Sequence, residues 1–194
     1  MSATYRNIYT CLICSYISFL SLIVLCILLR PDIFEHPDYA ISYFGSPGPA
    51  APAYYIGFAI IISCLVVIIT QLPKTFKMLR FGFLSAAVCL TGIVLTSYPQ
   101  GQDFLWTHGI FSVALVVSQS IAVVWIIRRQ DASAVDYVLA FAFWCAVILG
   151  LISSRWIALI PGLSVFPEIL LFSADILLLG RTTLRLLSAE QKAT

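Results

Sequence analysis

Long apolar runs separate the lysines and arginines of this chain into a few short segments. Nine of the eleven lie at the two chain ends or in two short connections, namely Arg6, Lys74, Lys77, Arg80, Arg128, Arg129, Arg181, Arg185 and Lys192. Short loops rich in Lys and Arg stay on the cytoplasmic side of a membrane. The pattern therefore predicts an all-α polytopic membrane protein: one bundle of six transmembrane helices, with the N- and C-termini cytoplasmic.

The apolar runs are long enough for this role, because a helix needs about 20 mainly apolar residues to cross the hydrocarbon core. We predict spans at 8–29, 53–72, 78–97, 105–127, 134–154 and 164–186. Only 10% of the residues are charged, against about 25% in soluble domains. We expect a single transmembrane domain over residues 1–194. The net charge of +2, with the bases at membrane ends, excludes nucleic acid as a partner.

Three connections, 30–52, 98–104 and 155–163, fall on the other side of this topology and are predicted to be extracytoplasmic. Five of the nine acids but only two of the eleven bases lie in or beside them. Eight of the nine prolines do so as well. Because proline lacks a backbone donor and fixes its own φ angle, we expect this face to consist of ordered, non-helical turns.

Both histidines of the chain, His36 and His108, belong to this outer face. Asp38 follows His36 closely, and Asp103 precedes His108. Imidazoles beside carboxylates bind ligands, or supply a general base and the acid that orients it. Their spacing matches no metal motif, so we predict neither a metal nor a cofactor. The alternative is that each histidine hydrogen-bonds across the outer connections and holds them in place.

Asp175 lies near the middle of the sixth predicted span. A charged acid at this depth costs a few kcal/mol or more, on the order of +3 on insertion scales, so it must be neutral, paired or beside water. Glu168 is seven residues earlier and on the same helical face. The two acids predict a polar path from the outer surface that holds a proton, a cation or a lipid headgroup. The alternative is that Asp175 hydrogen-bonds to a Ser or Thr on a neighbouring helix.

Arg155 directly follows the fifth predicted span on the outer side, whereas most bases of the chain lie on the predicted cytoplasmic side. We expect it to pair with Glu168 or Asp103, or to contact an anionic phosphate.

Small residues recur along one face of the third predicted span. Ser85, Cys89, Gly92 and Thr96 follow the spacing i, i+4, i+7 and i+11. Small residues allow helices to approach closely in lipid. The pattern predicts a packing face and a central position for this helix in the bundle.

Two outer segments resemble a known family. The segment 36–45, HPDYAISYFG, precedes a proline-rich turn and an apolar helix that opens at Tyr54; the segment 98–103 precedes His108 and Gly109. Both are similar to the outer motifs of the family catalogued as domain of unknown function 998. A more distant likeness is to the Frag/DRAM/Sfk membrane proteins, which are associated with membrane lipid organisation. The resemblance implies a six-helix membrane protein with a polar outer surface, and its positions of interest are Ser42, Gly45, Pro99, Asp103 and His108.

The sequence contains no G-x-S-x-G, Walker A or lipid-phosphatase motif. We therefore expect a non-enzymatic membrane protein with an outward-facing polar pocket that binds a lipid or small molecule. Membrane lipids are the expected partners, and the expected ligand-binding residues are His36, Asp38, Asp103, His108, Arg155, Glu168 and Asp175. A second hypothesis is an intramembrane enzyme acting on a lipid or isoprenoid, with His108 as base, Asp103 orienting it and Ser42 as nucleophile. An ion- or proton-coupled carrier and a structural subunit of a membrane complex are also compatible with the sequence.

Overall fold

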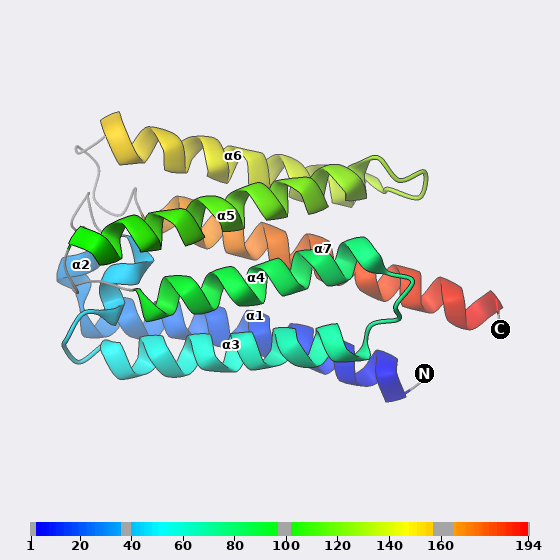
Figure 1. Ribbon diagram of the computed structural model, residues 1–194, viewed down its shortest axis with the longest axis horizontal. Helices are drawn as coiled ribbons and strands as arrows, with labels where there is room; N and C mark the ends of the chain where they lie inside the picture. The colour runs from blue at the N-terminus through cyan, green and yellow to red at the C-terminus, as the bar shows by residue number, and fades with distance from the viewer. Residues whose placement is uncertain (1–2, 36–39, 97–101, 157–164, 194) are drawn as a thin grey trace.

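The computed structural model describes residues 3–35, 40–96, 102–156 and 165–193, with backbone alone for residues 35, 102–105, 153–156 and 193. Within these ranges the chain forms seven α-helices and one short 3-10 helix, which confirms the all-α fold class. The six long helices are α1 (Ala3–Leu29), α3 (Ala51–Gln71), α4 (Lys77–Leu95), α5 (Gln102–Ile127), α6 (Ala134–Trp156) and α7 (Val165–Ala193). They lie side by side as a bundle, with both chain ends at the same end of it (Figure 1).

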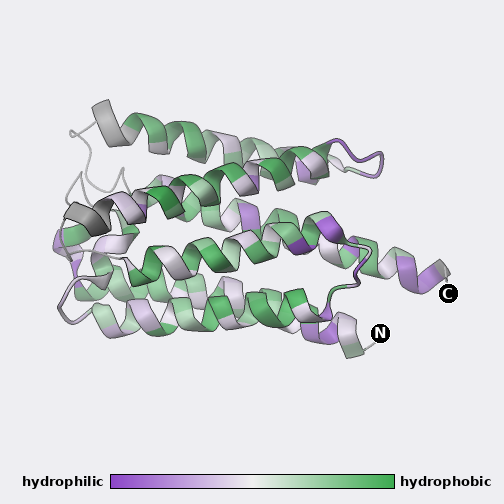
Figure 2. Cartoon of the chain, in the orientation of Figure 1, coloured by the Kyte–Doolittle hydropathy of each residue, from purple (hydrophilic) through white to green (hydrophobic). Residues whose placement is uncertain are grey.

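Five of these helices are long and apolar enough to cross a membrane, and they suggest a membrane protein. Among the described residues they are Ala3–Leu29, Ala51–Gln71, Lys77–Leu95, Trp106–Ile127 and Ala134–Ile152. Hydrophobic residues cover most of each helix, and hydrophilic residues gather toward the end with the termini (Figure 2). Large apolar side chains such as Leu28 and Phe141 lie exposed on the outside, as expected where lipid surrounds the bundle.

The helices extend beyond the predicted spans at both chain ends. Helix α1 begins at Ala3 instead of residue 8, and α7 continues to Ala193 instead of ending at 186. The added residues of α7 include Ala, Glu, Gln and Lys, which favour helix in water as well as in lipid. The length of the apolar run therefore underestimates the length of the helix, because residues with high helix propensity continue the helix beyond the apolar run.

The first outer connection contradicts the prediction of non-helical turns. It contains α2 (Pro31–Glu35) and the 3-10 helix η1 (Ile41–Gly45). Pro31 opens α2, where its missing N–H costs nothing, and Arg30 pairs with Asp32 at 2.7 Å. Ile41 and Phe44 of η1 are buried, so this segment packs onto the bundle.

Helices α5 and α6 each extend into one of the other two predicted outer connections, whereas α4 ends at Leu95, two residues before its predicted end. Helix α5 already begins at Gln102, and α6 continues to Trp156. Asp103 and Arg155 therefore belong to helices and not to connecting turns.

The predicted small-residue face of α4 packs against α5. The backbone oxygen of Gly82 and the hydroxyl of Ser85 both accept hydrogen bonds from Gln119 Nε2, at 3.0 and 3.1 Å. At Gly92 a Cβ atom would collide with the ring of Phe111. The close approach that the sequence pattern predicted is thus confirmed for α4 and α5.

Gly92→Ala is expected to destabilise the bundle. The Phe111 ring would have to move bodily, and overpacking of this kind costs about 1–3 kcal/mol. Gly109→Ala on α5 is the matched control, because a Cβ there meets no atom within 4 Å. Thermal unfolding of both variants in detergent would check this expectation. Equal melting temperatures for the two variants would contradict it.

Helix pairing leaves room at one end of the bundle. Helix α1 packs mainly on α3, α4 on α5, and α6 on α7, whereas α5 and α6 touch little although they are consecutive. A cavity lies there, lined by η1 and by residues of α3 to α7.

Candidate functional site

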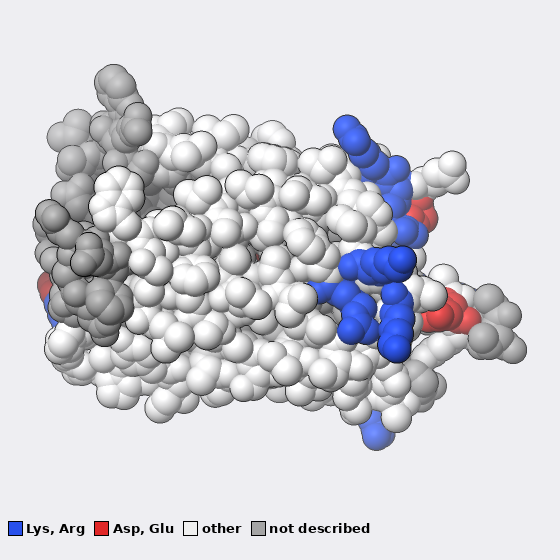
Figure 3. Space-filling view, in the orientation of Figure 1, with Lys and Arg blue, Asp and Glu red and all other residues white. Residues whose placement is uncertain are grey.

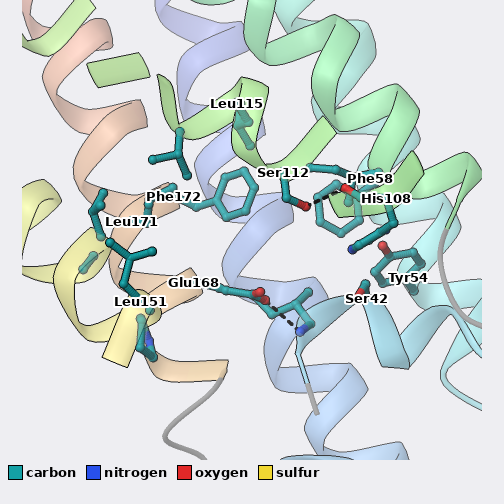
Figure 4. Close-up of a pocket in the computed structure, with 17 residues that line it drawn as sticks. Ser42, Tyr54, Phe58, His108, Ser112, Leu115, Leu151, Glu168, Leu171 and Phe172 are labelled. Atoms are coloured by element: carbon teal, nitrogen blue, oxygen red, sulfur yellow. Dashed lines mark hydrogen bonds between the residues drawn. The ribbon is translucent and has the colours of Figure 1, made fainter. Parts of the chain in front are cut away.

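A cavity of about 210 Å³ lies between η1 and helices α3 to α7. Five lining side chains carry polar atoms: Ser42 from η1, Tyr54 from α3, His108 and Ser112 from α5, and Glu168 from α7 (Figure 4). The rest of the lining is aromatic or aliphatic. A mainly apolar cavity with a few convergent polar groups is the usual form of a small-molecule site.

Glu168 ties η1 to the first turn of α7. The backbone N–H of Ile41 donates to Glu168 Oε2 at 2.8 Å (Figure 4). Two further bonds shape this segment: Tyr55 donates to the oxygen of Gly45 at 3.1 Å, and Ser46 Oγ to the oxygen of Tyr43 at 2.6 Å. The side chain of Ser42 is therefore held at the cavity wall by a segment fixed at both of its ends.

Removing the Glu168 carboxylate is expected to loosen η1. Glu168→Ala should raise hydrogen exchange at the Ile41 amide by roughly two- to tenfold, since a hydrogen bond contributes about 0.5–1.5 kcal/mol. Glu168→Gln keeps an acceptor oxygen and should exchange close to the wild-type rate. Unchanged protection in Glu168→Ala would show that the bond does not hold the segment.

His108 lies half-buried near the start of α5. Its Nδ1 is 3.4 Å from Thr96 Oγ1, a long and weak contact. Thr96 gives its own hydrogen to the oxygen of Gly92 at 2.6 Å, so its Oγ1 is placed to accept from Nδ1. In the neutral ring this tautomer leaves Nε2 as an acceptor. His108 can then accept a proton or a hydrogen bond from a ligand in the cavity.

The predicted site residues fall into four groups, of which Asp175 alone forms the last. Ser42, His108 and Glu168 line the one cavity. Asp103 and Arg155 lie on α5 and α6 near the same end, but their side chains are outside the described part of the chain. His36 and Asp38 lie outside the described residues altogether.

Asp175 belongs to a different hollow. It is buried, and within the described residues its Oδ1 accepts no hydrogen bond. It lines a void of about 20 Å³ together with Ser15 of α1, whose buried hydroxyl likewise has no partner in the described ranges. The void has room for about one water, which would need at least two polar partners. The predicted hydrogen bond to a neighbouring Ser or Thr is not formed at Oδ1.

Apolar side chains stand between the two acids of α7. Leu115, Leu171 and Phe172 line both the cavity that holds Glu168 and the void that holds Asp175. The structure thus places the two acids in separate hollows and not along one polar path.

Sequence reasoning missed a polar cluster at the opposite end of the bundle. Asp136 of α6 is fully buried, and it pairs with Arg185 at 2.6 Å and Arg181 at 3.2 Å. Its Oδ2 also accepts from the N–H and the hydroxyl of Ser133, at 2.7 and 2.9 Å. Ser133 and Asp136 form a capping box, a spacing visible in the sequence.

Asp131 extends this cluster toward solvent. It pairs with Arg129 at 2.8 Å and with Arg185 at 3.4 Å. The Arg129 guanidinium holds the pKa of the Asp131 carboxyl below its usual value. The ion pairs join α7 to the connection between α5 and α6.

No family model, curated protein or solved structure matches the chain, and the resemblance of its outer segments to the domain of unknown function 998 stays a prediction.

Proposed function

We propose that this chain is a six-span membrane protein whose cavity binds a lipid or another small amphipathic molecule from the extracytoplasmic side, without catalysis. One observation carries the proposal: the cavity has apolar walls and gathers Ser42, His108, Ser112 and Glu168. Such a lining suits a molecule with a hydrogen-bonding head and an apolar tail.

The sixth span is α7. Glu168 accepts a hydrogen bond from Ile41, and Asp175 is buried in the bundle, away from surrounding lipid. Its arginines Arg181 and Arg185 pair with Asp136. These contacts lower the cost of placing a helix with charged residues in lipid.

The distribution of bases supports the orientation. On the face shown in Figure 3, Lys and Arg gather at the end of the bundle that carries both termini. The positive-inside rule assigns that end to the cytoplasm. The cavity lies at the opposite end, which would then face outward.

Retention of lipid through purification tests the binding proposal. Mass spectrometry of protein purified in mild detergent should find a stoichiometric amphipathic molecule on the wild type. His108→Leu should lose it severalfold, because a hydrogen-bonding partner disappears from the cavity. Trp106→Leu, a change of an exposed neighbour on the same helix, should retain it. Absence of any bound molecule from wild type, or equal retention by both variants, would overturn the proposal.

An intramembrane enzyme acting on a lipid or isoprenoid is the second candidate. It is supported by Ser42 and His108 lining the same cavity, where a nucleophile and a base would meet a substrate. Thr96 lies 3.4 Å from the His108 ring, and Asp103 stays the proposed orienting residue, with its side chain outside the described part of the chain. A serine-reactive fluorophosphonate probe decides: labelling that Ser42→Ala abolishes would favour the enzyme, and no labelling would remove it.

A further inference from the structure

Helices α1 and α7 leave a groove of about 540 Å³ near the end of the bundle that carries the termini. Its walls change character along their length. Toward the middle of the bundle they are apolar, with Leu12, Ile13, Ile17 and Leu177. Toward the termini they carry Tyr9, Arg181 and Arg185. This groove is separate from the cavity beside η1, because the two share no lining residue.

Arg181 and Arg185 bring an excess of positive charge to the groove. They belong to an ion-pair cluster beside it, in which the guanidiniums of Arg129, Arg181 and Arg185 face two carboxylates, those of Asp131 and Asp136. Asp136 is shared between two of the arginines. One positive charge therefore has no carboxylate of its own in this cluster.

Arg181 keeps a donor group available to the groove. It uses Nε and Nη2 toward Asp136 and Ser133, and its side chain is 45% exposed. Among the described residues its Nη1 makes no hydrogen bond, so this nitrogen can donate to an anion in the groove. Arg185 adds a second positive charge beside it, although Nη2 of Arg185 is itself buried. Phosphate oxygens are suited to guanidinium donors.

We propose that the groove between α1 and α7 binds an anionic phospholipid. Its phosphate would sit against Arg181 and Arg185, beside the Tyr9 hydroxyl, and one acyl chain would lie along Leu12, Ile13 and Ile17. The apolar part of the groove favours a lipid over a free anion, because a soluble phosphate gains nothing from it. The uncompensated guanidinium favours an anionic over a zwitterionic headgroup.

Titration of the detergent-purified protein with dioleoylphosphatidylglycerol, dioleoylphosphatidylcholine or inorganic phosphate tests this assignment by native mass spectrometry. The wild type should bind phosphatidylglycerol about tenfold more tightly than phosphatidylcholine, and excess phosphate should not displace it. Arg181→Gln should weaken phosphatidylglycerol binding about tenfold, as expected for one lost charge-assisted contact. Asp136 keeps its partner Arg185 in this variant.

Two further variants separate charge from shape. Arg128→Gln removes the same charge from an exposed position outside the groove and should bind as the wild type does. Leu177→Trp fills the apolar part of the groove from an exposed position and should weaken both phospholipids.

Three outcomes would overturn the proposal. They are equal binding of the two phospholipids, equal losses in Arg181→Gln and Arg128→Gln, and displacement by phosphate, which would mark a site for free anions. His108→Leu should bind phosphatidylglycerol as the wild type does, because His108 lines the cavity beside η1 and not this groove. The proposals for the two sites can therefore be contradicted independently of each other.

Discussion

Asp136→Ala is expected to lower the free energy of unfolding by about 3 kcal/mol, the low end of the range for breaking a buried ion pair. The variant leaves Arg181 and Arg185 without the carboxylate that they share. We expect the low end of the range because both arginines keep some contact with solvent. The substitution also removes the capping partner of Ser133. Unfolding by SDS titration in mixed micelles would measure the loss.

Asp131→Ala is the control for this prediction. It removes a carboxylate from the same cluster, but the Asp131 side chain is 41% exposed. Exposed ion pairs contribute about 0–1 kcal/mol, so this variant should unfold close to the wild type. If Asp136→Ala lowered the free energy of unfolding by no more than Asp131→Ala does, burial of the ion pair would not matter for stability.

Gly150→Phe is expected to empty the cavity of its ligand. Gly150 of α6 lines the cavity, and a Cβ there would meet only Pro167 at 3.9 Å, an ordinary contact. A phenyl ring from this position would occupy space that the ligand needs. We expect loss of the co-purified molecule by at least a hundredfold, with little change in melting temperature. Quantitative mass spectrometry of the purified variant would measure it.

Gly109→Phe is its matched control. Gly109 lies on α5 near the same end of the bundle but does not line the cavity, and a Cβ there meets open space. The added ring should leave the bound molecule in place. Retention of the molecule by Gly150→Phe, or its loss from both variants, would contradict binding inside the cavity.

Much of the fold follows from local properties of the sequence. Apolar length and the positions of Arg and Lys predict all six long helices, because hydrophobic spacing and charge act on each segment by itself. The α4 packing face was also predictable, since Gly92 and its small neighbours repeat on one face. What local patterns underestimate is helix length, as the extension of α7 to Ala193 shows.

The site was predictable only in part. The distribution of Lys and Arg among the connections predicted that Ser42, His108 and Glu168 lie at one end of the bundle. In the structure these three residues line one cavity. The sequence could not predict that Asp175 and Glu168 line different cavities, because this depends on how the side chains of Leu171 and Phe172 pack between them. The pairing of Asp136 with Arg181 and Arg185 joins residues 45 and 49 positions apart. Only the Ser133–Asp136 capping box was readable locally.

The most direct test of the account is the sidedness of the bundle. Three single cysteines, in a background without the native ones, would be exposed in intact cells to a membrane-impermeant maleimide: Pro47→Cys beside η1, Gln130→Cys between α5 and α6, and Glu190→Cys on α7. All three positions are exposed. We expect labelling at 47 only, because the positive-inside rule places 130 and 190 in the cytoplasm. Labelling at 190 together with 47 would show that α7 does not cross the membrane, and labelling at 130 but not 47 would place the cavity on the cytoplasmic side.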